Sequence, residues 1–231
     1  MSDFHLFDIG SRGMVPARWH KLSDENIRIT GFEPDIEECE RLNHSALSTI
    51  FTTEIHHPLA VSEVNGFRDF WVTKDRALCS FHKPNELIFR NYQGKPDRAD
   101  IVRIESIPTI TLNKFCEEIG IQPHFIKIDT QGTEYSILKN YEGLKNVLGL
   151  EVELLVLPLY EGMFTNFTLC QRYLETWRFR PWWIEPVYWQ SLQGNYRRLA
   201  WFNALYINER FLNHELMPII YKAYAEEIGY E

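Results

Sequence analysis

The sequence predicts an α/β fold in which a mostly parallel β-sheet is covered by helices on both faces. Strand-like apolar runs alternate with helix-like segments from residue 5 to residue 155, an order that is typical of parallel sheets. A glycine turn, Gly10-Ser-Arg-Gly13, directly follows the first run. Two strand-like runs at 180–189 and 200–208 flank a turn, which predicts an antiparallel hairpin at the sheet edge.

The first part of the chain carries the clearest alternation. Residues 5–9 are a short apolar run that the glycine turn ends, as expected of a buried strand. Pro34 precedes the second predicted helix and suits its first turn, where a missing N–H costs nothing. The elements expected next are a helix, a strand, a helix and a strand at residues 14–24, 27–32, 35–43 and 49–56.

The segment from 63 to 105 interrupts this alternation. It contains two β-like runs, at 67–73 and 101–104, around a polar middle with Pro and Gly. We expect an inserted hairpin or lid here. Alternation then resumes with a helix that Thr111 caps and Gly120 ends. It continues with a strand, a helix and a strand at 125–129, 135–140 and 147–155, and after the hairpin a closing helix at 213–229.

Composition indicates one globular domain over residues 1–231. Hydrophobic residues make up 45% of the chain and charged residues 24%, which is ordinary for a domain of this length. The net charge of −8 argues against nucleic-acid binding, because phosphate backbones bind clustered Lys and Arg. No apolar segment approaches the roughly 18 residues of a membrane span.

The N-terminus and the cysteines indicate a cytoplasmic protein. Met1-Ser-Asp-Phe-His5 lacks the basic and apolar runs of a secretory signal. The four cysteines form no C-x-x-C pair, so we expect neither a disulfide framework nor a zinc site. No set of Asp, Glu and His has recognisable ligand spacing, so we expect no metal ion.

The glycine turn and Glu33 form the strongest chemical signal. Glu33 ends the second strand, 23 residues after Gly10. Ligands of doubly wound sheets bind at the carboxyl ends of the strands. Gly10 and Gly13 let the backbone approach a ligand, and the N–H groups of the turn can hold a carboxylate. Glu33 can accept both hydroxyls of a ribose, so we expect a Rossmann-like fold with a nucleoside ligand.

Asp8 distinguishes between the candidate nucleosides. A dinucleotide site uses G-x-G-x-x-G, but Asp8 stands two residues before Gly10, where that pattern has its first glycine. Its carboxylate would repel a pyrophosphate and could bind the ammonium or sulfonium side of S-adenosylmethionine. These charges favour the methyl donor. A nicotinamide-dependent oxidoreductase stays as an alternative.

Several motifs resemble the FkbM family of methyltransferases. They are Asp8-Ile-Gly10, Gly31-Phe-Glu33-Pro34-Asp35, the runs 107–112 and 125–134, and residues 153–160. They follow the family order from about residue 4 to residue 208, and Lys127-Ile-Asp129-x-x-Gly132-x-Glu134 is the most specific of them. The resemblance implies S-adenosylmethionine as cofactor, a seven-stranded class I methyltransferase sheet, and O-methylation of a sugar or secondary-metabolite hydroxyl.

The glycine turn departs from the family pattern. The family commonly shows Asp-x-Gly-Ala-Asn-x-Gly, whereas this chain has Arg12 and Met14 in place of the Asn and the last Gly. The loop is therefore expected to hold the methionine end differently, with Asp8 and Gly10 as the first candidate contacts and Ser11 and Arg12 after them. Carried over by position, the resemblance places Ala60 and Val61 against the adenine, and Pro34 beside the ribose-binding acid.

Asp129 is the first candidate for the chemistry, because it ends a central strand beside the glycine turn. Methyl transfer to oxygen needs donor and acceptor in line and a group that takes the acceptor's proton. Asp129 is expected either to bind the donor's ammonium or to serve as base. Lys127 shares its face of the strand and would keep the carboxylate ionised, which favours positioning.

Two further acids are candidates. Glu134 begins the next helix, where an acid gains from the helix dipole, so it either caps the helix or takes part in catalysis. Glu151 and Glu153 share one face of an otherwise apolar strand. Burying them without a role is costly, and we expect Glu153 to contact the site.

The acceptor is less defined. His56, His57 and His82 are possible general bases near neutral pH. An aromatic cluster either packs the terminal hairpin or stacks on sugar rings: Trp177, Trp182, Trp183, Trp189 and Trp201. We therefore predict transfer of a methyl group from S-adenosylmethionine to a hydroxyl of a carbohydrate or other small molecule, with a non-catalytic binding module as a second alternative.

Overall fold

The computed structural model describes residues 3–46, 50–94, 97–162 and 166–230. Its main sheet has seven strands in the order β3-β2-β1-β7-β8-β10-β9. The first five of these pair in parallel, and β10 pairs antiparallel with both β8 and β9. The mostly parallel sheet and the terminal hairpin are thus confirmed. The strands are β1 (Phe4–Ile9), β2 (Ile27–Phe32), β3 (Thr53–His57), β7 (Phe125–Ile128), β8 (Gly149–Leu155), β9 (Phe179–Gln190) and β10 (Arg197–Asn208).

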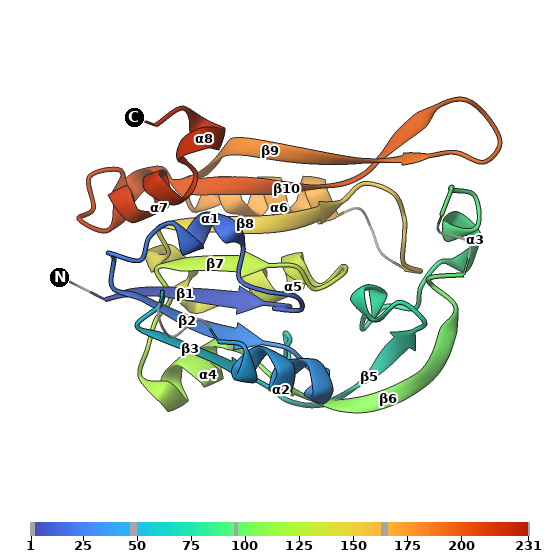
Figure 1. Ribbon diagram of the computed structural model, residues 1–231, viewed down its shortest axis with the longest axis horizontal. Helices are drawn as coiled ribbons and strands as arrows, with labels where there is room; N and C mark the ends of the chain where they lie inside the picture. Colours follow the sequence, from blue (N-terminus) through green and yellow to red (C-terminus); the bar gives the residue numbers. More distant parts are fainter. Residues whose placement is uncertain (1–2, 47–49, 95–96, 163–165, 231) are drawn as a thin grey trace.

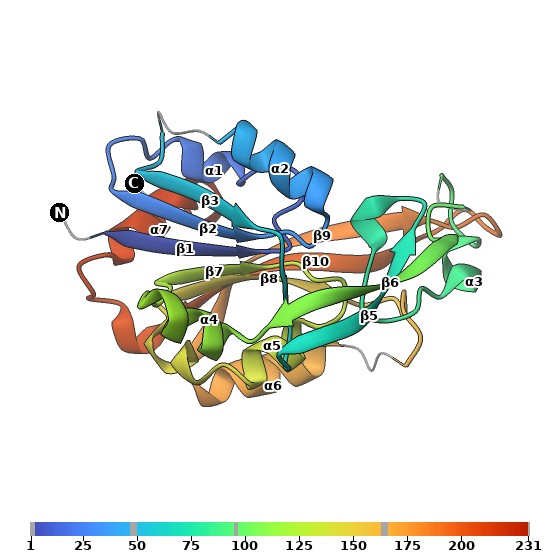
Figure 2. The same cartoon turned by 90° about the horizontal axis from the view of Figure 1, so that it is seen from below.

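Helices cover both faces of this sheet, as predicted. In Figure 2, α1 and α2 lie on one face and α4, α5 and α6 on the other. Successive side chains of β1 point to opposite faces of the sheet: Leu6 packs in the cluster with Trp19 of α1, and Phe7 packs in the cluster with Phe115 of α4. The helices are α1 (Ala17–His20), α2 (Ile36–His44), α3 (Glu86–Phe89), α4 (Leu112–Ile119), α5 (Glu134–Lys139), α6 (Asn166–Thr176), α7 (Met217–Ala223) and α8 (Ala225–Ile228). Short 3₁₀ helices are η1 (Arg76–Leu78), η2 (Glu142–Asn146) and η3 (Glu209–Phe211).

The segment predicted as an insertion forms a second, three-stranded sheet. Strand β6 (Ile101–Ile110) lies between β4 (Ala60–Val61), with which it is parallel, and β5 (Gly66–Thr73), with which it is antiparallel. This sheet extends past residues 63 and 105 at both ends. In Figures 1 and 2 it lies beyond the arrowheads of β1, β2 and β7. It therefore stands over the edge of the main sheet where ligands are expected.

Three elements, α1, β3 and α6, differ from the sequence prediction, and so does the closing helix described below. Helix α1 has four residues, because Pro16 before it has a ψ of 136°, outside helical geometry, although Val15 and Leu22 on either side are buried in the same cluster as Trp19. Strand β3 begins at Thr53; residue 49, its predicted start, lies outside the described residues. Helix α6 was not predicted, because its buried Cys170 and Leu174 are interspersed with exposed apolar residues.

The closing helix is divided at Tyr224 into α7 and α8. Tyr224 is fully buried and its hydroxyl donates to Glu151 of the central strand β8. This contact explains why its backbone leaves helical geometry. In the described part of the chain, no helix combines the length and the apolarity that crossing a membrane requires.

Candidate functional site

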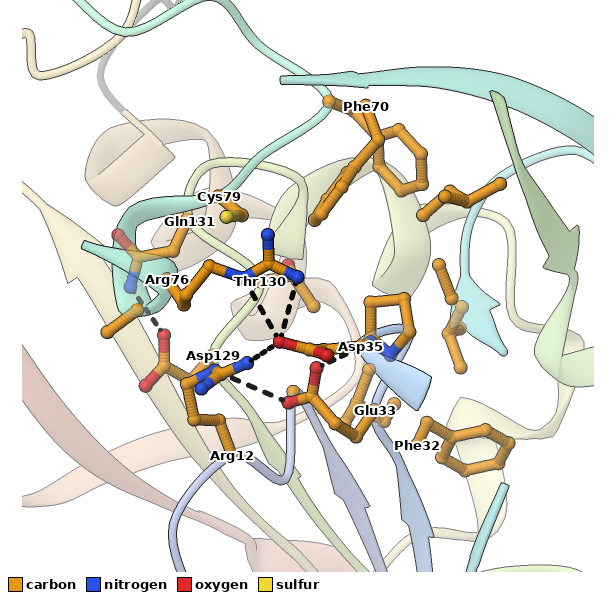
Figure 3. A pocket seen from close by; sticks show the side chains of 18 of the residues that line it. Arg12, Phe32, Glu33, Asp35, Phe70, Arg76, Cys79, Asp129, Thr130 and Gln131 are labelled. Atoms are coloured by element: carbon orange, nitrogen blue, oxygen red, sulfur yellow. Dashed lines mark hydrogen bonds and ion pairs between the residues drawn. The ribbon is translucent and has the colours of Figure 1, made fainter. Parts of the chain in front are cut away.

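A pocket opens at the carboxyl ends of β1, β2 and β7, beneath the insertion (Figure 3). The main sheet supplies one wall, and β5, β6 and η1 of the insertion supply the other. Seven residues predicted from the sequence line it together: Gly10, Arg12, Glu33, Pro34, Ala60, Val61 and Asp129. Asp8, Ser11, Lys127 and Glu153 lie behind its wall.

Gly10 is where the chain turns from β1 into the pocket. Its φ of +77° is a left-handed conformation, and a Cβ added there would lie 1.9 Å from the carbonyl oxygen of Asp129. The N–H groups of Gly10 and Ser11 both donate to the carbonyl of Phe32, at 3.0 Å. Only glycine allows this close approach, so the turn packs between the end of β2 and Asp129 at the end of β7.

Glu33 follows β2 and is 4% exposed. Burial raises its pKa to about 7. The backbone N–H of Asp35 donates to Glu33 Oε1 at 2.9 Å, and Arg12 Nε lies 3.9 Å from Oε2. The carboxylate is therefore oriented from two sides and remains at the pocket surface. Its acceptor oxygens suit a pair of ribose hydroxyls.

Asp35, which follows β2, contacts Arg12 of the glycine turn and Arg76 of the insertion, as Figure 3 shows. Its Oδ2 accepts from Nε and Nη2 of Arg76, at 3.1 and 3.0 Å, and from Arg12. Although burial raises the pKa of Asp35, its bonds to Arg76 and Arg12 lower it below the usual value. Arg12, which replaces the family's Asn, thus serves in an ion cluster at the end of β2. We call Arg12, Asp35 and Arg76 the mouth cluster.

Asp8 and Lys127 form a second ion pair beneath the glycine turn. They are register partners on β1 and β7, and Lys127 Nζ donates to Asp8 Oδ1 at 2.9 Å. Burial raises the pKa of Asp8. Burial lowers the pKa of Lys127, but Asp8 and then Asp129 raise it, and the net shift is upward. Asp8 Oδ2 is buried with no hydrogen-bond partner among the described residues.

Ser11 is held from behind the pocket by His56. The Ser11 hydroxyl lies 2.9 Å from His56 Nδ1, and His56 Nε2 lies 3.2 Å from Glu54. The ring occupies the space above Gly31, where a Cβ would lie 2.0 Å from Nδ1. His56 is therefore a support of the glycine turn. In the described part of the chain, neither it nor His57 or His82 lines the pocket.

Asp129 and Glu153 are linked by Gln131. Gln131 Nε2 donates to Asp129 Oδ1 and to Glu153 Oε2, both at 2.8 Å, and Tyr160 donates to Gln131 Oε1 at 2.8 Å. Burial, and next the neighbouring Asp129 carboxylate, raises the pKa of Glu153 well above its usual value. Gln131 thus connects Asp129, which lines the pocket, to the buried Glu153.

The loop that presents Asp129 is fixed by two neighbours. Glu134 accepts from the N–H groups of Thr130 and Gly132, at 2.8 and 3.0 Å, so it caps this loop. Ser80 of the insertion donates to the carbonyl of Gln131 at 2.8 Å. Gln131 has a φ of +57°, and such strain in a non-glycine residue is often found at functional sites.

Several pocket residues were not predicted as such. Gln131 stands inside the most specific matched motif, so its position was a usable signal. Arg76, Phe70 and Phe81 reach the pocket from the insertion, and their order in the sequence gives no such signal. The tryptophans, for which packing of the terminal hairpin and stacking on sugars were both considered, do not line this pocket in the described part of the chain. Trp189 is buried in a separate core cluster, and Trp182 stacks on Tyr221 of α7. Among the described residues, no His, Cys, Asp and Glu side chains group as a metal site.

A family profile and two solved structures are similar to this chain. The family profile described as "Methyltransferase FkbM domain" matches residues 10–181. No curated protein matches the chain. Precorrin-6y C5,15-methyltransferase from Geobacter metallireducens GS-15 is similar over 89% of this chain and 79% of its own, with 8% identity and a TM-score of 0.38. A SAM-dependent methyltransferase from Methanosarcina mazei is similar over 90% and 93%, with 12% identity and a TM-score of 0.40.

Proposed function

Because this chain belongs to the FkbM family of methyltransferases, whose methyl donor is S-adenosylmethionine, we propose that its pocket directs methyl transfer to a hydroxyl oxygen of a small-molecule acceptor. The observation that carries this proposal is the meeting of Glu33 and Asp129 in one pocket, on either side of the Gly10 turn. An adenosyl ligand needs a ribose acceptor and an ammonium acceptor, and these two acids end the strands on either side of β1, at the edge of the sheet where ligands bind.

The pocket fits the donor in four places. Glu33 accepts the ribose hydroxyls, with Pro34 beside it. Ala60 and Val61 form the short strand β4 in the pocket wall, and they contact the adenine. The glycine turn approaches the methionine end with its backbone at Gly10, supported by Ser11 and Arg12. Asp129 binds the ammonium group, since it lines the pocket, whereas Glu153 is buried behind it.

Bound S-adenosylmethionine supplies an electrophilic methyl group on its sulfonium. The protein orients the acceptor hydroxyl in line with it and takes up the proton that the hydroxyl loses. Asp129 is the candidate for that proton as well, because its carboxylate lines the pocket at the end of β7, beside the glycine turn. Lys127 and Glu153 act as positioning residues: Lys127 through Asp8 and the turn, and Glu153 through Gln131 and Asp129.

The acceptor class rests on the family resemblance. Hydroxyl methylation of a carbohydrate or secondary metabolite is what the resemblance implies, and it stays a prediction, as does the cytoplasmic location. Phe70, Phe81 and Cys79, which line the insertion side of the pocket, are the contacts that we propose for the acceptor.

Titration calorimetry with S-adenosylmethionine, S-adenosylhomocysteine and NAD tests the donor assignment. We expect both adenosyl ligands to bind and NAD not to bind. Glu33→Gln should weaken S-adenosylhomocysteine binding about tenfold or more, because a charged acceptor of two hydroxyls is lost. Glu40→Gln, on the exposed side of α2, is the matched control. Unchanged affinity in Glu33→Gln would contradict the placement of the ribose.

A panel of hydroxyl acceptors tests the reaction itself. Release of S-adenosylhomocysteine is measured with sugars, phenols and aliphatic alcohols, each with Asp129→Asn alongside the wild-type protein. We expect turnover on a hydroxyl acceptor and its loss in Asp129→Asn. Turnover only on amines or thiols would refute O-methylation, and donor binding without any turnover would favour the non-catalytic binding module.

A further inference from the structure

The insertion reaches the donor half of the pocket through Arg76. Arg76 belongs to η1 of the insertion, whereas its partner Asp35 directly follows β2 and precedes α2. Two N–H groups of the guanidinium converge on one carboxylate oxygen, at 3.1 and 3.0 Å. The close-up in Figure 3 shows the two side chains meeting at the level of Glu33 and Asp129.

Asp35 passes this constraint on to the ribose acceptor. The same residue whose carboxylate holds Arg76 donates its backbone N–H to Glu33 Oε1 at 2.9 Å. Its carboxylate also holds Arg12, whose Nε lies 3.9 Å from the other oxygen of Glu33. A contact made by the insertion is thus two hydrogen bonds away from the group that accepts the ribose.

The contact also sets one wall of the pocket. Ala77 and Cys79, on either side of η1's last residue, line the pocket together with Arg76. Arg76, Asp35 and Arg12 in addition line a second, more open hollow outside it. The mouth cluster therefore forms the partition between the inner pocket and that outer hollow.

We propose that Arg76 is a positioning residue for donor binding, which acts through Asp35 on Glu33 and makes the insertion part of the donor site. This inference rests on the proposed function. The side chains of Arg76 and Asp35 are partly exposed, at 34% and 15%, so an ion pair between them adds little to the stability of the fold. Two charge-assisted hydrogen bonds from one guanidinium to the same Asp35 oxygen do hold that oxygen in place, and fixed geometry is what raises affinity for a ligand.

Arg98 offers a matched control. It also belongs to the insertion and also pairs with an aspartate, Asp75, but both of these residues lie within the insertion. Arg98 does not line the pocket in the described part of the chain. Arg76→Gln and Arg98→Gln therefore remove the same charge and the same type of bond, and only the first removes the tie to β2.

The experiment is titration of the wild-type protein and both variants with S-adenosylhomocysteine, together with thermal unfolding. We expect Arg76→Gln to bind about tenfold more weakly and Arg98→Gln to bind within about twofold of wild type, with similar melting temperatures. Arg76→Lys keeps the positive charge but lacks the guanidinium group. Its affinity for S-adenosylhomocysteine should lie between those of Arg76→Gln and Arg98→Gln. If Arg76→Gln does not fold, Arg76→Lys replaces it in the comparison. Equal affinity of Arg76→Gln and wild type would overturn the inference. Failure of the wild-type protein to bind would instead overturn the proposed function.

A double-mutant cycle tests the route through Asp35. In an Asp35→Asn background, Arg76→Gln should weaken binding by less than about twofold, because its partner is already lost. If Arg76→Gln still weakens binding about tenfold in that background, Arg76 acts on the ligand directly and the positioning role is wrong.

Discussion

Two ion clusters of this molecule lie near the same turn but differ in their surroundings. Asp8 and Lys127 lie beneath the glycine turn, with side chains 1% and 16% exposed. The mouth cluster lies above it, with 28% for Arg12, 15% for Asp35 and 34% for Arg76. Both connect chain segments that are distant in sequence. The inner pair joins two strands of the main sheet, and the mouth cluster joins that sheet to the insertion.

This difference indicates that the same chemistry serves folding in one place and binding in the other. A charge left without its partner is costly where water is excluded, whereas water replaces a lost partner at the pocket mouth. The inner pair is therefore expected to determine whether the sheet forms, and the mouth cluster how well the formed sheet binds its ligand.

The largest expected effect is on the inner pair. Lys127→Met leaves the buried Asp8 carboxylate without a counterion and should lower the free energy of unfolding by about 3–5 kcal/mol, measured by urea denaturation. Lys114→Met is the control, because its pair with Glu118 is about half exposed and should change stability by about 0.5 kcal/mol or less. Adding Asp8→Asn to Lys127→Met should recover part of the loss. Equal stability of the two lysine variants would show that the buried pair of Asp8 and Lys127 contributes no more to folding than an exposed pair.

Glu33 provides a test that sets folding against binding. Burial raises its pKa from 4.5 to about 7. The folded protein therefore holds the Glu33 proton more tightly than the unfolded chain, and stability from this group is present below pH 4.5 and lost as pH rises through 7. The loss amounts to about 3 kcal/mol. Affinity for S-adenosylhomocysteine should rise over the same range, because ionised Glu33 is the better acceptor.

Denaturation of wild-type protein and Glu33→Gln between about pH 5 and about pH 8 measures the contribution of Glu33 to the free energy of unfolding. The stability difference between them should shift in favour of Glu33→Gln as pH rises. A difference that does not vary with pH would mean that Glu33 titrates as in the unfolded chain.

Substitution of the two glycines of the turn by alanine should give the smallest of these losses of stability. It tests the turn that lies between the inner pair and the mouth cluster. An added Cβ at Gly10 meets the backbone of Asp129, whereas at Gly13, with a φ of +99°, it meets no heavy atom within 4 Å among the described residues. Gly13→Ala should cost about 1 kcal/mol for its backbone conformation, and Gly10→Ala about 2 kcal/mol or more, with loss of S-adenosylhomocysteine binding. Calorimetry and denaturation of both variants measure this. Similar losses in the two would show that the close approach to Asp129 is unimportant.

The sequence predicted the parts of the site that depend on local pattern. An apolar run that ends in glycine placed Gly10 at the end of β1, and an acid after the next run placed Glu33 at the end of β2. Parallel strands carry their carboxyl ends to one edge, so the meeting of these residues with Asp129 followed from strand order alone. Helix α6 was missed for the opposite reason, since its apolar residues do not follow one clear period.

The sequence by itself therefore determined the main sheet, the turn at Gly10 and the candidate acids, because strand and turn signals act over a few residues. Only the tertiary structure decided which acid each cation meets. Lys127 lies beneath the turn with Asp8, 119 residues away, and Arg76 crosses from the insertion to Asp35, 41 residues away. The physical reason is that ion pairs depend on distance in space, and a side chain's neighbours across strands are set by register and packing, which no local pattern contains.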